Sequence, residues 1–327
     1  MAKLTMVQAI NLALDQEMAA DKNVLIMGED VGVDGGVFRV TDGLLAKYGA
    51  GRVLDTPLAE SAIIGAAVGM ALAGLRPVCE MQFCGFSYIS IPQIEGHASR
   101  YRSRTQSTRS VPLVMRFPYG GGVHALEHHS EAREVLYAHI PGVKVVVPSG
   151  PRNARALMVA AIRDPDPVVF MEPKRSYRAF REEVPDESEV MEIGRAQVIQ
   201  PGTDITVITW GAMTHVVKQA LEKLAAKSKA SVELVDLLTL SPLDGATIAA
   251  SVRKTGRAVV VQESPKSYGP AAEIIAQINE KALMYLTAPV KRVSGYDVCT
   301  PYFGREDGYI PGPEVIAAAI TETLEFR

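Results

Sequence analysis

The chain has 327 residues, of which 47% are hydrophobic and 22% are charged, so its composition is that of a globular protein and its length favours two domains. Its 34 basic and 37 acidic side chains give a formal net charge of −3, which argues against both a nucleic-acid-binding protein and one held on an anionic membrane. The three cysteines, Cys79, Cys84 and Cys299, are too few for a disulfide framework and lack metal-ligand spacing. A reducing cytoplasm is therefore the expected compartment.

The first domain is expected to begin with a helix. Thr5 and Gln8 form a capping-box pattern, apolar residues follow at helical spacing, and the segment has no secretory signal pattern. Short apolar runs then alternate with helical segments. The runs that we expect to be strands are NVLIMGED, RPVCEMQF, VPLVMRFP, VKVVVP and PVVFMEP. This alternation predicts a mainly parallel sheet flanked by helices.

Glu60 stands at the start of a run, 61–75, that has no ionisable side chain and is too short to span a bilayer, so we expect a buried helix. One interpretation is structural: Thr56 caps the helix, Pro57 takes its first position, and Glu60 lies in the first turn, where the helix dipole favours negative charge. The other is functional: apolar neighbours such as Leu58 desolvate the carboxyl group, which then exchanges a proton with a ligand. Local sequence leaves both open.

The segment FPYGGGVHALEHHSEA places three glycines before three histidines, His124, His128 and His129. Consecutive glycines allow a tight turn or a close backbone approach. A zinc site is disfavoured because no C-x-x-C or H-E-x-x-H motif is present, so a general acid/base histidine is favoured and a structural one remains the alternative. The segment GEDVGVDGGVF lacks dinucleotide-binding spacing, and no Walker motif occurs. Another chain would therefore hold the phosphates of any phosphorylated cofactor.

A charged segment with several prolines and glycines, 176–204, has the composition of a connector. We therefore predict a first α/β domain over 1–190 and a second over 200–327. The second domain is expected to contain strands at DITVITWG, SVELVDLL, RAVVVQES and APVKRVSG, separated by helices.

Several long blocks, in order along nearly the whole chain, resemble one family. MGEDVGVDGGVFRVTDGL, RVLDTPLAESAIIGAAVGMALAGLRPVCEMQF, PGVKVVVPSGP, DPDPVVFMEPKR and VVVQESPKS are similar to the beta subunit of the decarboxylating component of 2-oxo acid dehydrogenase complexes. GGGVH and YRAFREEVP are most similar to pyruvate-type beta chains. The resemblance implies a thiamine diphosphate pyrimidine-binding domain followed by a transketolase C-terminal-like domain.

The resemblance also implies an activity and partners. The enzyme would be an α2β2 heterotetramer that decarboxylates a 2-oxo acid, pyruvate by preference, and transfers the acyl group to a lipoyl group on a dihydrolipoyl acyltransferase core. The alpha subunit would bind the diphosphate and Mg²⁺ through a GDG…N motif. This chain contains no GDG, in agreement with that division.

Residue roles follow from the same resemblance. Glu60 occupies the position of the family's pyrimidine-binding glutamate, which activates the cofactor, and Leu58, Gln82 and Phe86 occupy positions that line the same ring. His129 aligns with the active-site histidine, expected to act as acid/base during transfer to the lipoyl group. Because Glu131 stands where relatives carry glutamine, the partner of that histidine is left open, and His128 competes for the role.

The family further implies a structural K⁺ held by oxygen atoms, a donor type that suits a hard cation. The matching positions are Leu113, Ala161, Ile162, Asp164 and Asp166. A plain turn at DPDP is the alternative. Glu29, at the end of its predicted strand, is expected to face the cofactor, because ligands favour the carboxyl ends of parallel strands.

Two alternatives remain from the sequence. A branched-chain 2-oxo acid or acetoin dehydrogenase beta subunit would share the site residues named above. A noncatalytic subunit that only bridges the alpha subunit to the acyltransferase core would not need Glu60.

Overall fold

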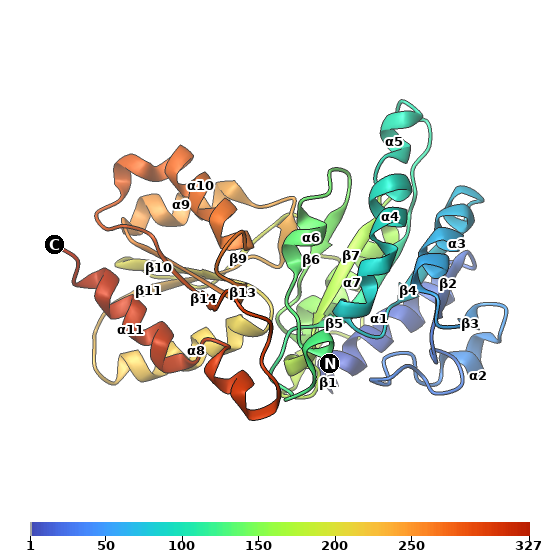
Figure 1. The fold of residues 1–327 in the computed structure, drawn as a ribbon, viewed down its shortest axis with the longest axis horizontal. Coiled ribbons are helices and arrows are strands. Elements are labelled where there is room, and N and C mark those ends of the chain that lie inside the picture. Colours follow the sequence, from blue (N-terminus) through green and yellow to red (C-terminus); the bar gives the residue numbers. More distant parts are fainter. Residues whose placement is uncertain (1) are drawn as a thin grey trace.

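The computed structural model describes residues 2–327, which form two α/β units (Figure 1). The first unit contains a sheet in the order β12-β6-β7-β5-β4-β2-β3, parallel except for the pairing of β12 with β6. Its strands are β2 (Val24–Gly28), β3 (Val53–Asp55), β4 (Arg76–Glu80), β5 (Val114–Tyr119), β6 (Lys144–Val146), β7 (Val168–Pro173) and β12 (Thr239–Ser241). All five strands predicted for this domain are confirmed, because strands buried on both faces are apolar throughout.

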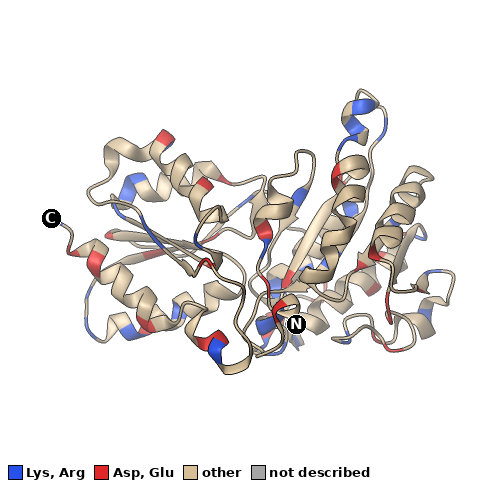
Figure 2. Ribbon diagram, viewed as in Figure 1, with Lys and Arg blue, Asp and Glu red and all other residues tan. Residues whose placement is uncertain are grey.

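Helices cover both faces of the first sheet (Figure 1). One face packs against α1 (Met6–Ala20), α2 (Leu44–Tyr48) and α7 (Pro151–Arg163). The other packs against α3 (Glu60–Leu72), α4 (Ile91–Gln93), α6 (Glu134–Ala138) and the 3₁₀ segment η1 (Cys84–Ser90). The capping box that opens α1 is confirmed, with the Gln8 amide 3.4 Å from Thr5 Oγ1. Basic residues lie in and around α5 (Tyr101–Arg104), at the end of a projecting segment (Figure 2).

The helix α3 differs from its prediction in two ways. It begins at Glu60, and Ala59 rather than Thr56 occupies the N-cap position, without a side-chain hydrogen bond. Thr56 lies four residues before the first residue of the helix, and its amide donates to the carbonyl of Gly28, 2.9 Å away, so it belongs to the sheet edge. The helix is also only partly buried: one face packs on the core, while Ala62, Ala66 and Gly69 are exposed.

The second unit contains a sheet in the order β14-β13-β10-β11-β9, in which β9 is antiparallel to β11 and the other pairs are parallel. Its strands are β9 (Gln197–Gln200), β10 (Ile205–Thr209), β11 (Val232–Asp236), β13 (Ala258–Pro265) and β14 (Lys291–Gly295). One face carries α9 (Gly245–Thr255) and α10 (Pro270–Ala282), and the other carries α8 (Ala212–Ala225) and α11 (Pro313–Leu324) (Figure 1). The predicted fold class, two α/β domains with mainly parallel sheets, is confirmed.

The two units share core and sheet. One hydrophobic cluster contains Met115 and Phe117 of the first sheet together with Ile208 and Trp210 of the second unit. The strand β12 also joins the first sheet, although it follows the second unit's β11 in the chain. The division between 190 and 200 stays a prediction. No helix within residues 2–327 has the length and hydrophobicity needed to cross a bilayer.

Candidate active site

The carboxyl ends of three neighbouring strands bring most of the predicted site residues to one edge of the first sheet. Gly28, the last residue of β2, is in register with Asp55 of β3 and Glu80 of β4. The segments that leave these strands carry Glu29 and Asp30, then Leu58 to Glu60, then Gln82 to Phe86. Since parallel strands end together at one edge, residues far apart in sequence meet here.

Glu29 has an unusual environment at this edge. Its side chain is 3% exposed, and neither carboxyl oxygen has a hydrogen-bond partner among the described residues. Burial, with added repulsion from the charges of Glu60 and Asp30, raises the pKa of Glu29 to about 7. A carboxyl group that takes up protons near neutral pH suits exchange of a proton with a ligand.

Glu60 is the first residue of α3, where the exposed amides of the helix favour its negative charge. It is half-buried, Leu58 is 79% exposed, and Ile63 and Ile64 are buried. Within this chain, the apolar environment expected for Glu60 is therefore open on the side of Leu58. Gln82 is oriented by a hydrogen bond of 3.2 Å from its Nε2 to Asp30 Oδ2.

Two histidines lie beside the segment that follows β4. The His129 ring meets the Phe83 and Phe86 rings edge-on, at centroid distances of 4.3 and 5.2 Å. Its Nδ1 is buried without a partner, and burial, followed by the charges of Lys174 and His128, lowers the pKa of His129. The ring is therefore mostly neutral at pH 7 and available to accept a proton.

His128 is placed differently. It is exposed, its Nδ1 lies 3.6 Å from Glu131 Oε2, and its ring is 6.3 Å from that of Phe86. Gly85 allows this loop to approach closely, because a Cβ at that position would lie 2.4 Å from the His128 carbonyl oxygen. The inward-facing ring beside Phe86 is thus His129.

The five positions expected to hold K⁺ lie where α7 ends and β5 and β7 begin, and their polar groups have protein partners. The carbonyl oxygens of Leu113 and Ala161 accept from backbone amides at 3.0 and 3.3 Å. Ile162 and Asp164 offer carbonyls that accept from the Arg76 guanidinium at 2.9 and 3.4 Å. Each carbonyl oxygen keeps a second lone pair, so the set still suits a hard cation.

Two carboxylates in this set are already paired with cations. Asp164 accepts from Lys144 at 2.6 and 2.8 Å, and Asp166 accepts from Arg102 Nε at 2.6 Å. Among residues 2–327, no group of three or more histidine, cysteine, aspartate or glutamate side chains is arranged to hold a metal ion. Any cation bound here would depend on carbonyl oxygens.

Sequence reasoning missed a buried charge cluster behind the site. Arg116 is 1% exposed and donates to both oxygens of Glu172, at 2.6 and 2.7 Å, and to Glu80. Glu80 also lies against the turn after Glu29, where a Cβ on Gly36 would be 2.9 Å from its carboxyl oxygen. Single charged residues inside the strand runs RPVCEMQF, VPLVMRFP and PVVFMEP were the available signal.

A hollow of about 440 Å³ lies elsewhere, between α6 and α10, and none of the predicted site residues lines it. At the candidate site itself, Leu58 is exposed at the edge of the first sheet.

Comparison with known proteins gives two family matches. Residues 2–179 match the transketolase pyrimidine binding domain, and residues 194–316 match the transketolase C-terminal domain. The chain is 52% identical over its full length to the pyruvate dehydrogenase E1 component subunit beta of Acholeplasma laidlawii, and 49% identical to those of Staphylococcus aureus and Bacillus subtilis, each also covered in full. A solved structure named as a split gene transketolase, inactive beta4 tetramer, is similar with a TM-score of 0.82, 21% identity and 99% coverage of both chains, which supports the fold.

Proposed function

We propose that this chain, which belongs to the family of pyruvate dehydrogenase E1 component beta subunits, is the beta subunit of a thiamine diphosphate-dependent pyruvate dehydrogenase. The observation that carries the proposal is the position of Glu60 at the first turn of α3 beside the buried Glu29, in a chain that matches this family from end to end. The reaction is the oxidative decarboxylation of pyruvate, with transfer of the acyl group to a lipoyl group.

The residues at the sheet edge fit the cofactor that the family implies. Glu29 and His129 each present buried polar atoms without a partner, and Leu58 and Phe86 present apolar surface beside them. This combination suits a flat heterocycle with nitrogen atoms at its edge. Glu60, Leu58, Gln82 and Phe86 would hold the aminopyrimidine ring. When bound, thiamine diphosphate supplies the nucleophilic carbon and the electron sink that decarboxylation requires.

The chain's own groups would handle protons. The Glu60 carboxyl group would share a proton with a ring nitrogen, which favours the form of the aminopyrimidine that acts as a base. His129, held against Phe83 and Phe86 with a lowered pKa, would accept and return a proton as the acyl group passes to the lipoyl group. Its exposed neighbour His128 remains the alternative for this role.

The partners follow from what the chain leaves open. The exposed Leu58 and the exposed face of α3 are apolar surfaces that a second polypeptide would cover. We propose that the alpha subunit covers the site, holds the diphosphate and Mg²⁺, and completes an α2β2 heterotetramer that docks on a dihydrolipoyl acyltransferase core. The three cysteines are free thiols, in keeping with the cytoplasm as the proposed compartment.

A structural K⁺ is proposed at the carbonyl set around α7 and β7. Leu113, Ala161, Ile162 and Asp164 would contribute backbone oxygens, and Asp166 a carboxylate oxygen. The ion would stabilise the turn at the end of α7.

The test is reconstitution with the alpha subunit. The tetramer should decarboxylate pyruvate, and it should do so faster than it decarboxylates 3-methyl-2-oxobutanoate or releases acetaldehyde from acetoin. A large preference for the branched-chain acid or for acetoin would replace pyruvate as the substrate. Tetramer that assembles without turning over any of these compounds would favour a noncatalytic bridging subunit.

A further inference from the structure

The second unit has a crevice of the kind that binds ligands in single-domain α/β proteins. From β10 the chain passes to β11 on one side and later to β13 on the other, so the carboxyl ends of β10 and β13 form a topological switch point. In this protein the first unit fills that crevice. Tyr119 Oη would lie 2.2 Å from a Cβ on Gly211, and Trp210 Nε1 donates to Glu134 at 3.0 Å.

Two carboxylates of the second unit reach from this crevice to the glycine segment that precedes His129. Glu263, on β13 and 4% exposed, accepts a hydrogen bond from the Gly121 amide. Glu306, 0% exposed, accepts from the His124 amide at 2.8 Å. Both acceptors are carboxyl groups with almost no exposed surface, and the bond from Gly121 is fully buried, so losing either acceptor would leave a backbone amide without its partner.

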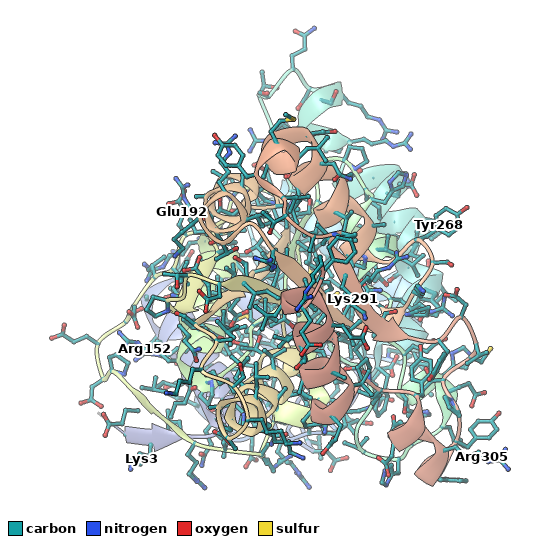
Figure 3. All side chains as sticks on the ribbon, turned by 90° about the vertical axis from the view of Figure 1, so that its left-hand side faces the viewer. Lys3, Arg152, Glu192, Tyr268, Lys291 and Arg305 are labelled. Carbon is teal, nitrogen blue, oxygen red and sulfur yellow. The ribbon has the colours of Figure 1, made fainter. Side chains whose placement is uncertain are left out.

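Glu306 is buried although its neighbours in the chain are exposed. It lies on the 3₁₀ segment η6 (Phe303–Gly308), whose other residues are all exposed. Arg305, its neighbour, extends from the outer surface of the second unit (Figure 3). Carboxylates are rarely buried without a specific partner. The backbone of the glycine segment is the partner that the structure provides.

The glycines are required by the closeness of this contact. A Cβ on Gly121 would lie 2.1 Å from Glu306 Oε1, and a Cβ on Gly120 would lie 2.9 Å from Glu263 Oε1. Gly120 also has a φ of +79°, which other residues rarely adopt. Gly120 and Gly121 therefore let the two carboxyl groups approach the backbone.

Lys174 connects these carboxylates to the histidine. It is buried at the end of β7, and its Nζ donates to the His129 carbonyl oxygen. Its charge is attracted by those of Glu263 and Glu306, while burial lowers the pKa of Lys174 to about 8. The loop has little regular structure of its own, since its one 3₁₀ turn, η3, covers only Glu127–His129.

We propose that Glu263, Glu306 and Lys174 form an interdomain clamp that positions the His129 loop for catalysis. The three are positioning residues: they hold the backbone on both sides of the loop, and none of them meets the reacting groups. The catalytic role that we give to this clamp rests on the proposed function. The second unit would thus contribute to the active site by holding the backbone of the His129 loop.

The test compares Glu306→Ala with Glu314→Ala in the reconstituted tetramer. Glu314 is an exposed glutamate on α11 whose ion pair with Lys223 is also exposed, which makes it a matched control. Hydrogen exchange followed by mass spectrometry should show amides of residues 120–131 exchanging about tenfold or more faster in Glu306→Ala, the effect of losing one hydrogen bond to a charged group. Glu314→Ala should leave them unchanged.

A split between partial reactions tests the positioning role. In Glu306→Ala, acyl transfer to a lipoyl domain should fall about tenfold or more, as expected for a displaced acid/base group, and decarboxylation with an artificial electron acceptor should fall less. Glu306→Gln keeps an acceptor oxygen and should restore most of the transfer rate. Unchanged exchange in Glu306→Ala, or faster exchange with unchanged transfer, would overturn the proposal.

Gly121→Ala tests the same contact from the loop side, even if Glu306→Ala fails to assemble. The added methyl group should displace the Glu306 carboxylate, raise exchange over 120–131 and lower acyl transfer. Gly51→Ala, at a position with open space, is the control. A Gly121→Ala tetramer that matches Gly51→Ala in both measurements would contradict the clamp. Wild-type tetramer without pyruvate decarboxylation would instead contradict the proposed function, and the exchange data would still decide the clamp.

Discussion

Replacing Arg116 by methionine should destabilise the first domain severely. The guanidinium is 1% exposed and is the counter-charge to Glu172, which is 0% exposed, and Glu80, which is 3% exposed. Methionine keeps much of the volume but leaves both carboxylates buried without their cation. Breaking a buried ion pair in this way costs about 3–5 kcal/mol, because the remaining charge stays desolvated.

Thermal unfolding of the assembled tetramer measures this cost. For a protein of this size, a loss of that order corresponds to a fall in Tm of about 5–15 °C. Replacing both carboxylates as well, in Arg116→Met/Glu80→Gln/Glu172→Gln, should recover most of the loss, because no uncompensated charge remains.

The dependence of the loss on pH gives a second check. Burial already raises the pKa of Glu80, so the folded state takes up a proton more readily than the unfolded chain, and that contribution to stability falls as pH rises. Without Arg116 the loss in Tm should therefore be larger at pH 8 than at pH 5. A fall in Tm under 2 °C, or a triple variant no more stable than Arg116→Met, would refute this reasoning.

Three further predictions concern other groups. Glu29→Gln should lower pyruvate decarboxylation at least about tenfold, because it removes a carboxyl group that titrates near neutral pH, and an unchanged rate would exclude a role for Glu29. Burial raises the pKa of Asp236 to about 7, so the contribution of this group to stability is present at acidic pH and lost as pH rises through 7. The stability of Asp236→Asn relative to wild type should therefore increase by about 1–3 kcal/mol from pH 5 to pH 8. A difference in unfolding midpoints that stays constant with pH would contradict this prediction. Replacing Na⁺ by K⁺ at constant ionic strength should raise Tm by several degrees, and Asp166→Ala should reduce that rise. Equal unfolding midpoints in the two salts would rule out the proposed K⁺ site.

The sheets of both domains were predictable from sequence because their central strands are buried on both faces. Continuous runs such as VKVVVP and RAVVVQES carry that signal without any knowledge of the partners. The site edge was predictable in part for the same reason. Once parallel strands are expected, Glu29 and Gln82 must follow their carboxyl ends and lie close together.

What the sequence did not predict depends on contacts between distant segments. Glu263 is 142 residues from Gly121, and Glu306 is 182 residues from His124, so no local pattern connects them. The segment FGREDG looks like an exposed polar turn, although its glutamate is buried. Its composition gave no signal of that burial.

The helix α3 shows a second kind of error. An uninterrupted apolar run predicts burial on all sides, but one face of α3 is exposed in this chain. Some apolar residues of this run pack in the core of this chain, and others form the surface that we propose the alpha subunit covers. The Thr56 cap failed for a simpler reason: a capping residue cannot be identified when backbone pairing extends the preceding strand past it.

The central claim is that Glu60 activates the cofactor through its carboxyl group. The most direct measurement is pyruvate decarboxylation by reconstituted tetramer carrying Glu60→Ala, with Glu95→Ala, a more exposed glutamate, as control. We predict a loss of at least about a hundredfold for Glu60→Ala, the scale of removing one positioned proton-transfer group, with the control close to wild type. A Glu60→Ala tetramer that turns over pyruvate at the wild-type rate would contradict the account.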